Sequence, residues 1–370
     1  MYHSKEDQEA LEVIVRLDER LNFEEIDIGG KTKTVIHKGY GSQYLFHIEK
    51  FVKAIQRGWK GGFIEEKARY SGIRMIRELY LAKKYYRSLN DWIERHSKLY
   101  RYSARVEVFY SVCKEMGLIG ECNSYFREPG EIARGDGARY MDVFNALIDA
   151  INARCQSREF KEEERLRLHN AECNEKNVLA RGEAMFSPET GRSRWLVLSL
   201  TLRYKPQYRR WITPETIQQH RDRFFAARRF NKLMAGIENY VWTIEQGDDT
   251  GLHLHVILFY SAEHNHDEFI AEQIGRYWVD EVTGGKGSYW NSNRAWLKRR
   301  YMKLGHGIGV GQINSNEVEK REALRKNLIY LAKAEQYLLS WSTERIHTFG
   351  MAKTPKKVKA GRPRIHSSAP

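Results

Sequence analysis

The chain has 370 residues, which is long enough for two domains with separate hydrophobic cores. Its 62 Lys and Arg residues outnumber 48 Asp and Glu residues, and its 9 Trp and 21 Tyr are interleaved with the basic residues. No apolar run approaches the roughly 18 residues of a membrane span, so a polyanion such as nucleic acid is the expected partner and a membrane is not. The N-terminal segment has no secretion-signal pattern, and four cysteines without Cys-x-x-Cys spacing predict free thiols in a reducing cytoplasm.

The chain up to residue 189 has the periodicity of helices. Apolar residues recur three and four positions apart in segments 43–59, 72–100 and 141–155, and a charged, exposed stretch follows at 156–181. We interpret residues 1–189 as a helical accessory region. It contains no catalytic motif, and its basic residues are expected to be solvated helix faces.

Residues 190–350 have the pattern of an α+β domain, which begins after the turn-rich passage at 185–194. A strand is predicted at 195–204, a helix from Thr213 to about Leu233, a hairpin at 240–260 and a helix from Asp267 to about Val282. After a basic loop, a strand at 306–313 and a long helix at 316–341 complete the order β-α-β-β-α-β-α. This is the order of the split βαβ arrangement of RRM and ferredoxin-like domains, with an antiparallel sheet and an extra C-terminal helix.

The predicted hairpin brings a carboxylate and two imidazoles together. If residues 247–251 form its loop, Glu245 is opposite His253, and His255 is a diagonal neighbour on the same face of the sheet. One carboxylate and two imidazoles suit a divalent cation with open coordination positions, such as Mg²⁺ or Mn²⁺, and zinc would also bind them. A second pair, His264 and His266, lies among polar residues before a helix and is interpreted as solvated.

The last predicted helix places Tyr330 at the edge of its buried stripe. Leu324, Leu328, Leu331 and Leu338 cluster on one side of the helical wheel, and Tyr330, Lys333 and Tyr337 fall roughly 110° from the centre of that cluster. Tyr330 is either a boundary tyrosine or a tyrosine that acts on phosphate, with Lys333 one turn away to assist it.

Basic residues elsewhere are candidates for DNA binding. In the α+β domain they are Arg203, Lys205, Arg209, Arg210, Arg228 and Arg229. Residues 351–370 are rich in Lys and Arg without an acid and are expected to be disordered in isolation. Their "KAGRPR" run, which includes Arg362 and Arg364, resembles an AT-hook core, and a generic basic tail is the alternative.

Three segments, "LVLSLTLRY", "GLHLHVILFY" and "YLAK", resemble in order and character the motifs of HUH-type rolling-circle replication initiators. More narrowly, residues 190–364 look like the inovirus gene-two-type family, also called the YagK/YfjJ C-terminal domain, of filamentous phages and prophage elements. The resemblance implies that His253 and His255 bind metal with Glu245, that Tyr330 is the nucleophile and that Lys333 assists it. One departure is Ser199, where the family's first motif usually has threonine.

The resemblance also implies a function. A phage or prophage initiator of this kind nicks origin DNA in single-stranded form, becomes linked to the 5′-phosphate through tyrosine, and works with host replication proteins. Relaxases place the tyrosine before the histidines, and single-strand transposases are usually small, so an initiator fits this chain better. The alternatives are a DNA-binding regulator that keeps the fold without nicking, and an unrelated metallohydrolase that uses Glu245 as a base.

Overall fold

Helix α7, Arg158–Met185, contains the boundary between two units of the chain. The computed structural model describes residues 23–28, 31–36, 43–67, 74–98, 100–120, 125–188, 192–247, 249–263, 265–303, 305–340 and 346–353. The main segment of the first unit is Gly41–Asn170, and that of the second is Ala171–Glu335. The sequence pattern predicted a boundary at residue 189, whereas the second unit includes the C-terminal half of α7.

The first unit is mainly helical, and aromatic rings form its core. The ring centroid of Phe51 lies 5.9 Å from that of Trp92 and 6.0 Å from that of Phe144. Its elements in chain order are α2 (Gln43–Gln56), β3 (Phe63–Lys67), β4 (Arg74–Glu78), α3 (Tyr80–Tyr85), η1 (Tyr86–Ser88), α4 (Leu89–Glu94), β5 (Tyr100–Tyr102), α5 (Ala104–Glu115), α6 (Tyr140–Gln156) and the start of α7.

The prediction of a helical N-terminal region misses several short strands. Strands β3 and β4 form an antiparallel pair in which Arg74 contacts Glu65 and Arg77 contacts Glu66. Opposite charges on paired strands favour this hairpin, and residues 74–78 are at most half-buried, so they have no apolar stripe that would favour a helix. Strands β1 (Phe23–Ile28) and β2 (Lys31–Ile36) form another antiparallel pair.

An antiparallel sheet forms the second unit, with strands in the order β10-β6-β8-β7-β12 and β9 also paired with β6. Strand β8 lies between β6 and β7, so the helix that connects β6 to β7 passes over a strand that comes later in the chain. The elements are β6 (Arg194–Tyr204), η3 (Pro206–Trp211), α8 (Pro214–Ala226), η4 (Ala227–Arg229), α9 (Lys232–Ala235), β7 (Ile237–Gly247), β8 (Gly251–Tyr260), α10 (Asp267–Tyr277), η5 (Trp278–Val282), β9 (Gly287–Asn291), α11 (Ala295–Lys303), β10 (Gly311–Asn314), α12 (Val318–Tyr337), β11 (Leu338–Ser340) and β12 (Phe349–Met351).

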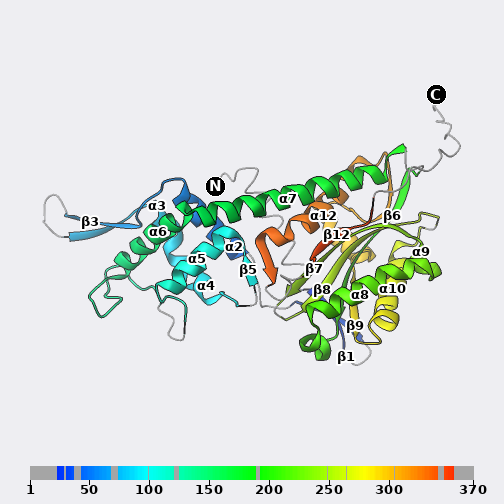
Figure 1. Cartoon of the computed structure of the whole chain (residues 1–370), viewed down its shortest axis with the longest axis horizontal. Coiled ribbons are helices and arrows are strands. Elements are labelled where there is room, and N and C mark those ends of the chain that lie inside the picture. The colour runs from blue at the N-terminus through cyan, green and yellow to red at the C-terminus, as the bar shows by residue number, and fades with distance from the viewer. Residues whose placement is uncertain are drawn as a thin grey trace. The chain divides into compact units, whose positions relative to one another are not determined.

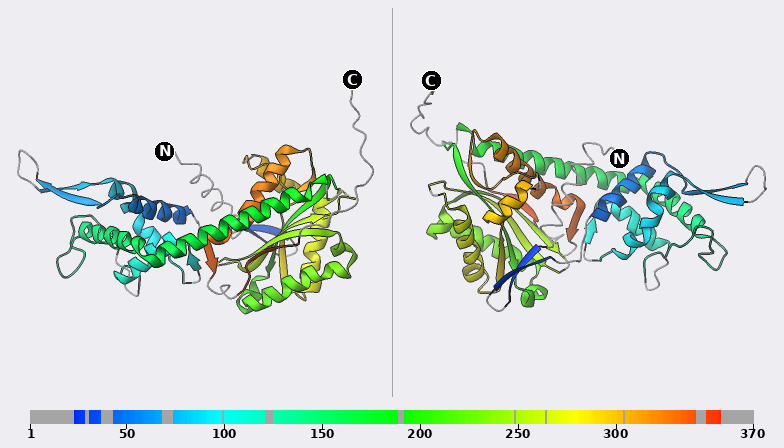
Figure 2. Two further views of the ribbon diagram at one scale, coloured as in Figure 1. Left: turned by 45° about the horizontal axis from the view of Figure 1, so that its top comes forward. Right: turned by 180° about the vertical axis from the view of Figure 1, so that it is seen from behind.

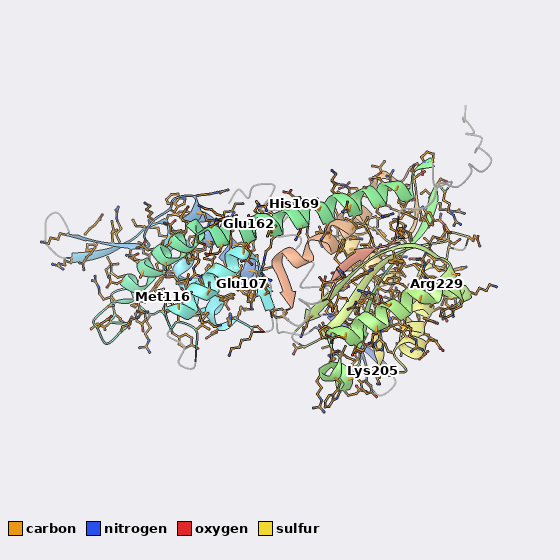
Figure 3. All side chains as sticks on the ribbon, in the orientation of Figure 1. Glu107, Met116, Glu162, His169, Lys205 and Arg229 are labelled. Atoms are coloured by element: carbon orange, nitrogen blue, oxygen red, sulfur yellow. The ribbon has the colours of Figure 1, made fainter. Side chains whose placement is uncertain are left out.

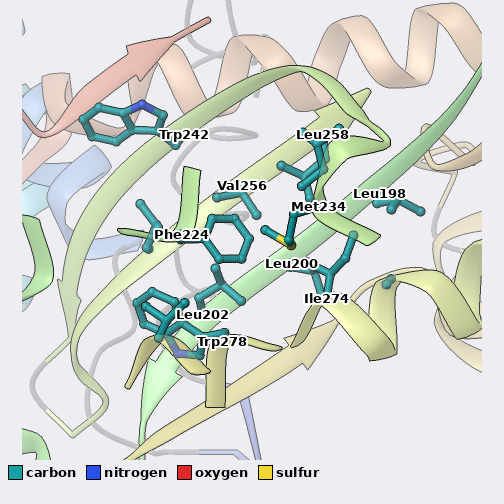
Figure 4. Packing of buried hydrophobic residues seen from close by; sticks show 14 of the residues in the cluster. Leu198, Leu200, Leu202, Phe224, Met234, Trp242, Val256, Leu258, Ile274 and Trp278 are labelled. Atoms are coloured by element: carbon teal, nitrogen blue, oxygen red, sulfur yellow. The ribbon is translucent and has the colours of Figure 1, made fainter. Parts of the chain in front are cut away.

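Alternation along the strands divides the core between the two faces of the sheet. On one face, Leu198, Leu200 and Leu202 of β6 pack with Phe224 of α8 and Ile274 of α10 (Figure 4). Full burial of each such side chain contributes about 1.5–3 kcal/mol to stability. This layer therefore fixes which face of β6 points toward α8 and α10. The remaining side chains of the strands therefore point to the opposite face.

Helices α7 and α12 cover that opposite face of the sheet (Figures 1 and 2). The apolar contacts there join Val178 and Met185 of α7, Leu324, Leu328 and Leu331 of α12, and Val197, Val241, Ile257 and Phe259 of the sheet. The predicted leucine stripe of the last helix is confirmed for the three leucines whose side chains are described. The odd-numbered residues of β6, of β8 and of β7 from Asn239 onward consequently face α12, whereas Ile237, before a register shift in β7, packs on the other face.

Two helix boundaries differ from the sequence prediction. Thr213 caps α8 as expected, with its side chain accepting from the amide of Thr216, but the helix ends at Ala226. A new cap at Asn231 then starts the short helix α9, so the predicted helix to Leu233 is divided into two. The predicted basic loop before β10 also contains two regular elements, β9 and α11.

Candidate metal and nucleophile site

The hairpin of β7 and β8 has the register that the sequence predicted. Glu245 is paired with His253, and Gln246 with Leu252. The hairpin closes through Gly251, whose φ of +65° lies in the left-handed region that glycine adopts without steric cost. His253 and His255 are two residues apart on an interior strand, so both side chains point to the face that α12 covers.

Glu245, His253 and His255 are buried and form a set of possible metal ligands. Their ligand atoms all lie within 4.8 Å of one another. Oε2 of Glu245 is 3.1 Å from Nε2 of His255 and 3.8 Å from Nε2 of His253. Two ligands at right angles around a metal, each about 2.1 Å from it, are about 3.0 Å apart, so these separations fit a shared divalent ion after small movements.

Contacts behind the two imidazoles hold their Nε2 atoms toward Glu245. Nδ1 of His253 donates to the carbonyl oxygen of Gly251 at 2.8 Å, so in the neutral ring Nε2 keeps its lone pair. Nδ1 of His255 lies 2.8 Å from Oγ1 of Thr201, and it donates to that oxygen when Nε2 is a ligand. Burial lowers the pKa of His253, which favours the neutral form that binds metal.

A cavity of about 860 Å³, counting the part open to solvent, lies between the sheet and α12. Both His255 and Tyr330 line it, and Tyr330 is only 5% exposed. Helix α12 is held at this position because Leu324, Leu328 and Leu331 pack against the sheet, and Leu331 also lines the cavity. A tyrosine from α12 and one metal-ligand candidate from β8 therefore share one cavity.

Several lining residues of this cavity were not predicted from the sequence. They come from β6, β9, α11, α12 and the loops beside them, and are Ser199, Thr201, Trp290, Ser292, Tyr301, His306 and Asn327. Gly309 supplied a signal: a Cβ at this position would lie 2.6 Å from the backbone nitrogen of Leu324, so the loop touches α12 closely. The glycine-rich "HGIGVG" run thus marks a close backbone approach beside the nucleophile helix.

Lys333 contacts helix α7. Its Nζ lies 2.8 Å from Oε2 of Glu175, and it is not among the residues that line the cavity. The ion pair therefore links α12 to α7. The side chain of Tyr337 lies outside the described residues.

The predicted DNA-binding arginines of this unit occupy different environments. Arg203 is buried and lines the cavity, whereas Arg209 is held by the carbonyl oxygens of Tyr204 and Asp249. Arg210 is exposed and its guanidinium lies 4.5 Å from the ring centroid of Trp211, which is itself exposed.

The other three candidates lie beside or within the short helices η3 and η4. Arg228 donates to the carbonyl oxygens of Ile237 and Glu238, so part of its role is to hold the start of β7. Lys205 precedes α8 and Arg229 follows it, and both are labelled in Figure 3. None of these three lines the cavity.

The remaining predicted sites are only partly described. His266 is exposed at the start of α10, as expected, and His264 lies outside the described residues. Arg362 and Arg364 of the basic tail lie outside them as well. Cys113, Cys155 and Cys173 are free thiols, in agreement with the cysteine spacing.

Comparisons with known proteins leave the site to be interpreted from its own geometry. No family model, no curated protein and no solved structure matches the chain. Within the described residues, no helix combines the length and apolar character needed to cross a bilayer.

Proposed function

We propose that the chain is an HUH-type DNA endonuclease of a phage or prophage element, which nicks single-stranded origin DNA through Tyr330. The observation that carries the proposal is that Tyr330 and His255 line one cavity, next to a buried glutamate and a second histidine. The strand order also supports it, because β6 and β7 flank β8 as the split βαβ arrangement requires.

The proposed reaction exchanges one phosphodiester bond for another. The phenolic oxygen of Tyr330 attacks the scissile phosphorus and gives up its proton, and the 3′-oxygen of the preceding nucleotide leaves and gains one. The products are a 5′-phosphotyrosine link and a free 3′-hydroxyl. The bond count is conserved, so the same tyrosine can later be displaced by a 3′-hydroxyl to rejoin the strand.

Each part of the site has a stated task in this proposal. Glu245, His253 and His255 would hold Mg²⁺ or Mn²⁺, which supplies charge neutralisation and orientation for the phosphate. Thr201 and Gly251 hold the two imidazoles in position. Lys333 supports the helix that carries Tyr330 through its contact with Glu175, and the sheet face and α12 limit the access of water.

Covalent capture tests the proposal. The protein is incubated with Mn²⁺ and single-stranded DNA from each strand of the element that carries its gene, and the mixture is run on a denaturing gel. We expect a protein–DNA adduct with the wild type and with Tyr337→Phe, and none with Tyr330→Phe. DNA binding without an adduct from the wild type would favour a regulator that keeps the fold, and an adduct that is lost only in Tyr337→Phe would move the nucleophile two turns along α12.

A further inference from the structure

Arg203 is a buried cation inside the cavity that contains Tyr330. Its side chain is 2% exposed and comes from β6, two residues after Thr201, on the face that α12 covers. Burial lowers the pKa of its guanidinium to about 9, and the charge of Glu245 opposes this shift. The guanidinium is therefore charged at neutral pH, and Glu245, which would also bind the metal, acts on it electrostatically.

A metal ion would change the charge balance around Arg203. With a divalent ion in place, two charges of the ion and one of Arg203 would oppose the single negative charge of Glu245. Like charges that are shielded from water repel strongly, so this state is unfavourable until an anion enters the cavity. A phosphodiester is such an anion, and it offers two unesterified oxygens at once.

The guanidinium of Arg203 can donate to one of those oxygens, while the other is available to the metal ion. Arginine presents its donors in a planar fork that binds phosphate with more directional specificity than lysine does. Ser199 and Thr201 line the same cavity and carry hydroxyl groups. The cavity therefore combines one of the metal-ligand candidates, His255, with the cation of Arg203 and hydroxyl groups around the space next to Tyr330.

We propose that Arg203 couples metal binding to phosphodiester binding. It lowers the affinity of the site for the metal ion when the ion binds alone, and it binds the phosphate when the ion and the phosphodiester are both present. The inference rests on the proposed metal site and nucleotide substrate, but it does not require strand cleavage. If Arg203 were only a structural partner of Glu245, its removal would change metal affinity without changing the effect of a phosphodiester.

A thermodynamic cycle separates these possibilities. Mn²⁺ is titrated by calorimetry with and without the dinucleotide TpT, which has a single phosphodiester, into the wild type and into Arg203→Met. For the wild type we expect TpT to raise Mn²⁺ affinity about tenfold or more, within the usual range of coupling between sites. For Arg203→Met we expect tighter binding of Mn²⁺ alone and an enhancement by TpT below about threefold.

Two further variants keep the test decisive. Arg299→Met removes the same charge from an exposed position outside the cavity and should behave as the wild type. Arg203→Lys keeps the charge without the fork, so it should bind Mn²⁺ alone as the wild type does and lose part of the coupling, even if Arg203→Met does not fold. Equal enhancement by TpT in the wild type and in the folded Arg203 variants would overturn the proposal, as would no enhancement in the wild type. Failure of the proposed nicking function would instead appear as missing adduct with the coupling intact.

Discussion

The hydroxyl of Thr201 is the contact through which the fold orients His255. It lies 2.8 Å from Nδ1, and both residues are 4% exposed. Thr201→Val replaces the hydroxyl by a methyl group of similar size and keeps the β-branched shape that suits a strand. The change therefore removes one hydrogen bond with little change in packing.

The expected loss follows from two consequences of that change. Removal of a hydrogen bond behind a metal-bound histidine typically lowers metal affinity by about 10–100-fold, or about 1.4–2.7 kcal/mol. The buried Nδ1 also loses this partner, which lowers the free energy of unfolding by about 1–3 kcal/mol. Calorimetry with Mn²⁺ and thermal denaturation measure the two effects separately.

Thr243 provides a matched control on the other side of His255. It is paired with His255 in the register of β7 and β8 and is fully buried, and its hydroxyl has no hydrogen-bond partner among the described residues. Thr243→Val should leave Mn²⁺ affinity unchanged and raise stability by up to about 1 kcal/mol, because it removes an unsatisfied buried group. Wild-type affinity in Thr201→Val, or an equal loss in both variants, would refute the role assigned to Thr201.

The remaining predictions concern α12, the loop beneath it and the tail. Lys333→Met and Glu175→Gln should each lower the free energy of unfolding by about 0.5–1 kcal/mol, and the double variant should lower it by less than the sum of the two. Chemical denaturation of the three variants and the wild type measures this, and full additivity would show that the ion pair contributes nothing. Gly309→Ala should lower the free energy of unfolding by about 1–3 kcal/mol, and with it the melting temperature, because the new Cβ would meet the backbone of α12. Gly135→Ala, which has open space around it, should leave the melting temperature unchanged. Deletion of 354–370 removes five basic residues and should reduce the slope of log affinity for single-stranded DNA against log salt by up to about 3.5; an unchanged slope would show that the tail does not touch phosphate.

The hairpin could be predicted from sequence because its information is local. A turn-forming loop between two alternating segments fixes the register, and the register places Glu245 beside His253. The leucine stripe of α12 is equally local. The same alternation also places Arg203 on the face of Ser199 and Thr201, but the sequence marked it only as a basic DNA-binding candidate, and its burial in the cavity comes from the structure.

The rest of the cavity wall depends on tertiary pairing. Strand β9 has five residues and begins with glycine, and its contact with β6 is specified by the folded sheet and not by its own pattern. Helix α11 follows within a segment whose basic residues suggested a loop. The strands of the first unit were missed for a similar reason, since β4 is short and exposed and is defined by its pairing with β3.

Peptide mapping of the covalent adduct tests the central claim most directly, because trypsin separates the two tyrosines of α12. Cleavage after Lys326 and Lys333 releases the peptide 327–333, "NLIYLAK", in which Tyr330 is the single tyrosine, whereas Tyr337 falls in the peptide 334–345. The adduct formed with Mn²⁺ is digested with nuclease and trypsin and analysed by mass spectrometry. We expect the nucleotide on peptide 327–333, and its presence on peptide 334–345 or on any other peptide would contradict the assignment of Tyr330 as the nucleophile.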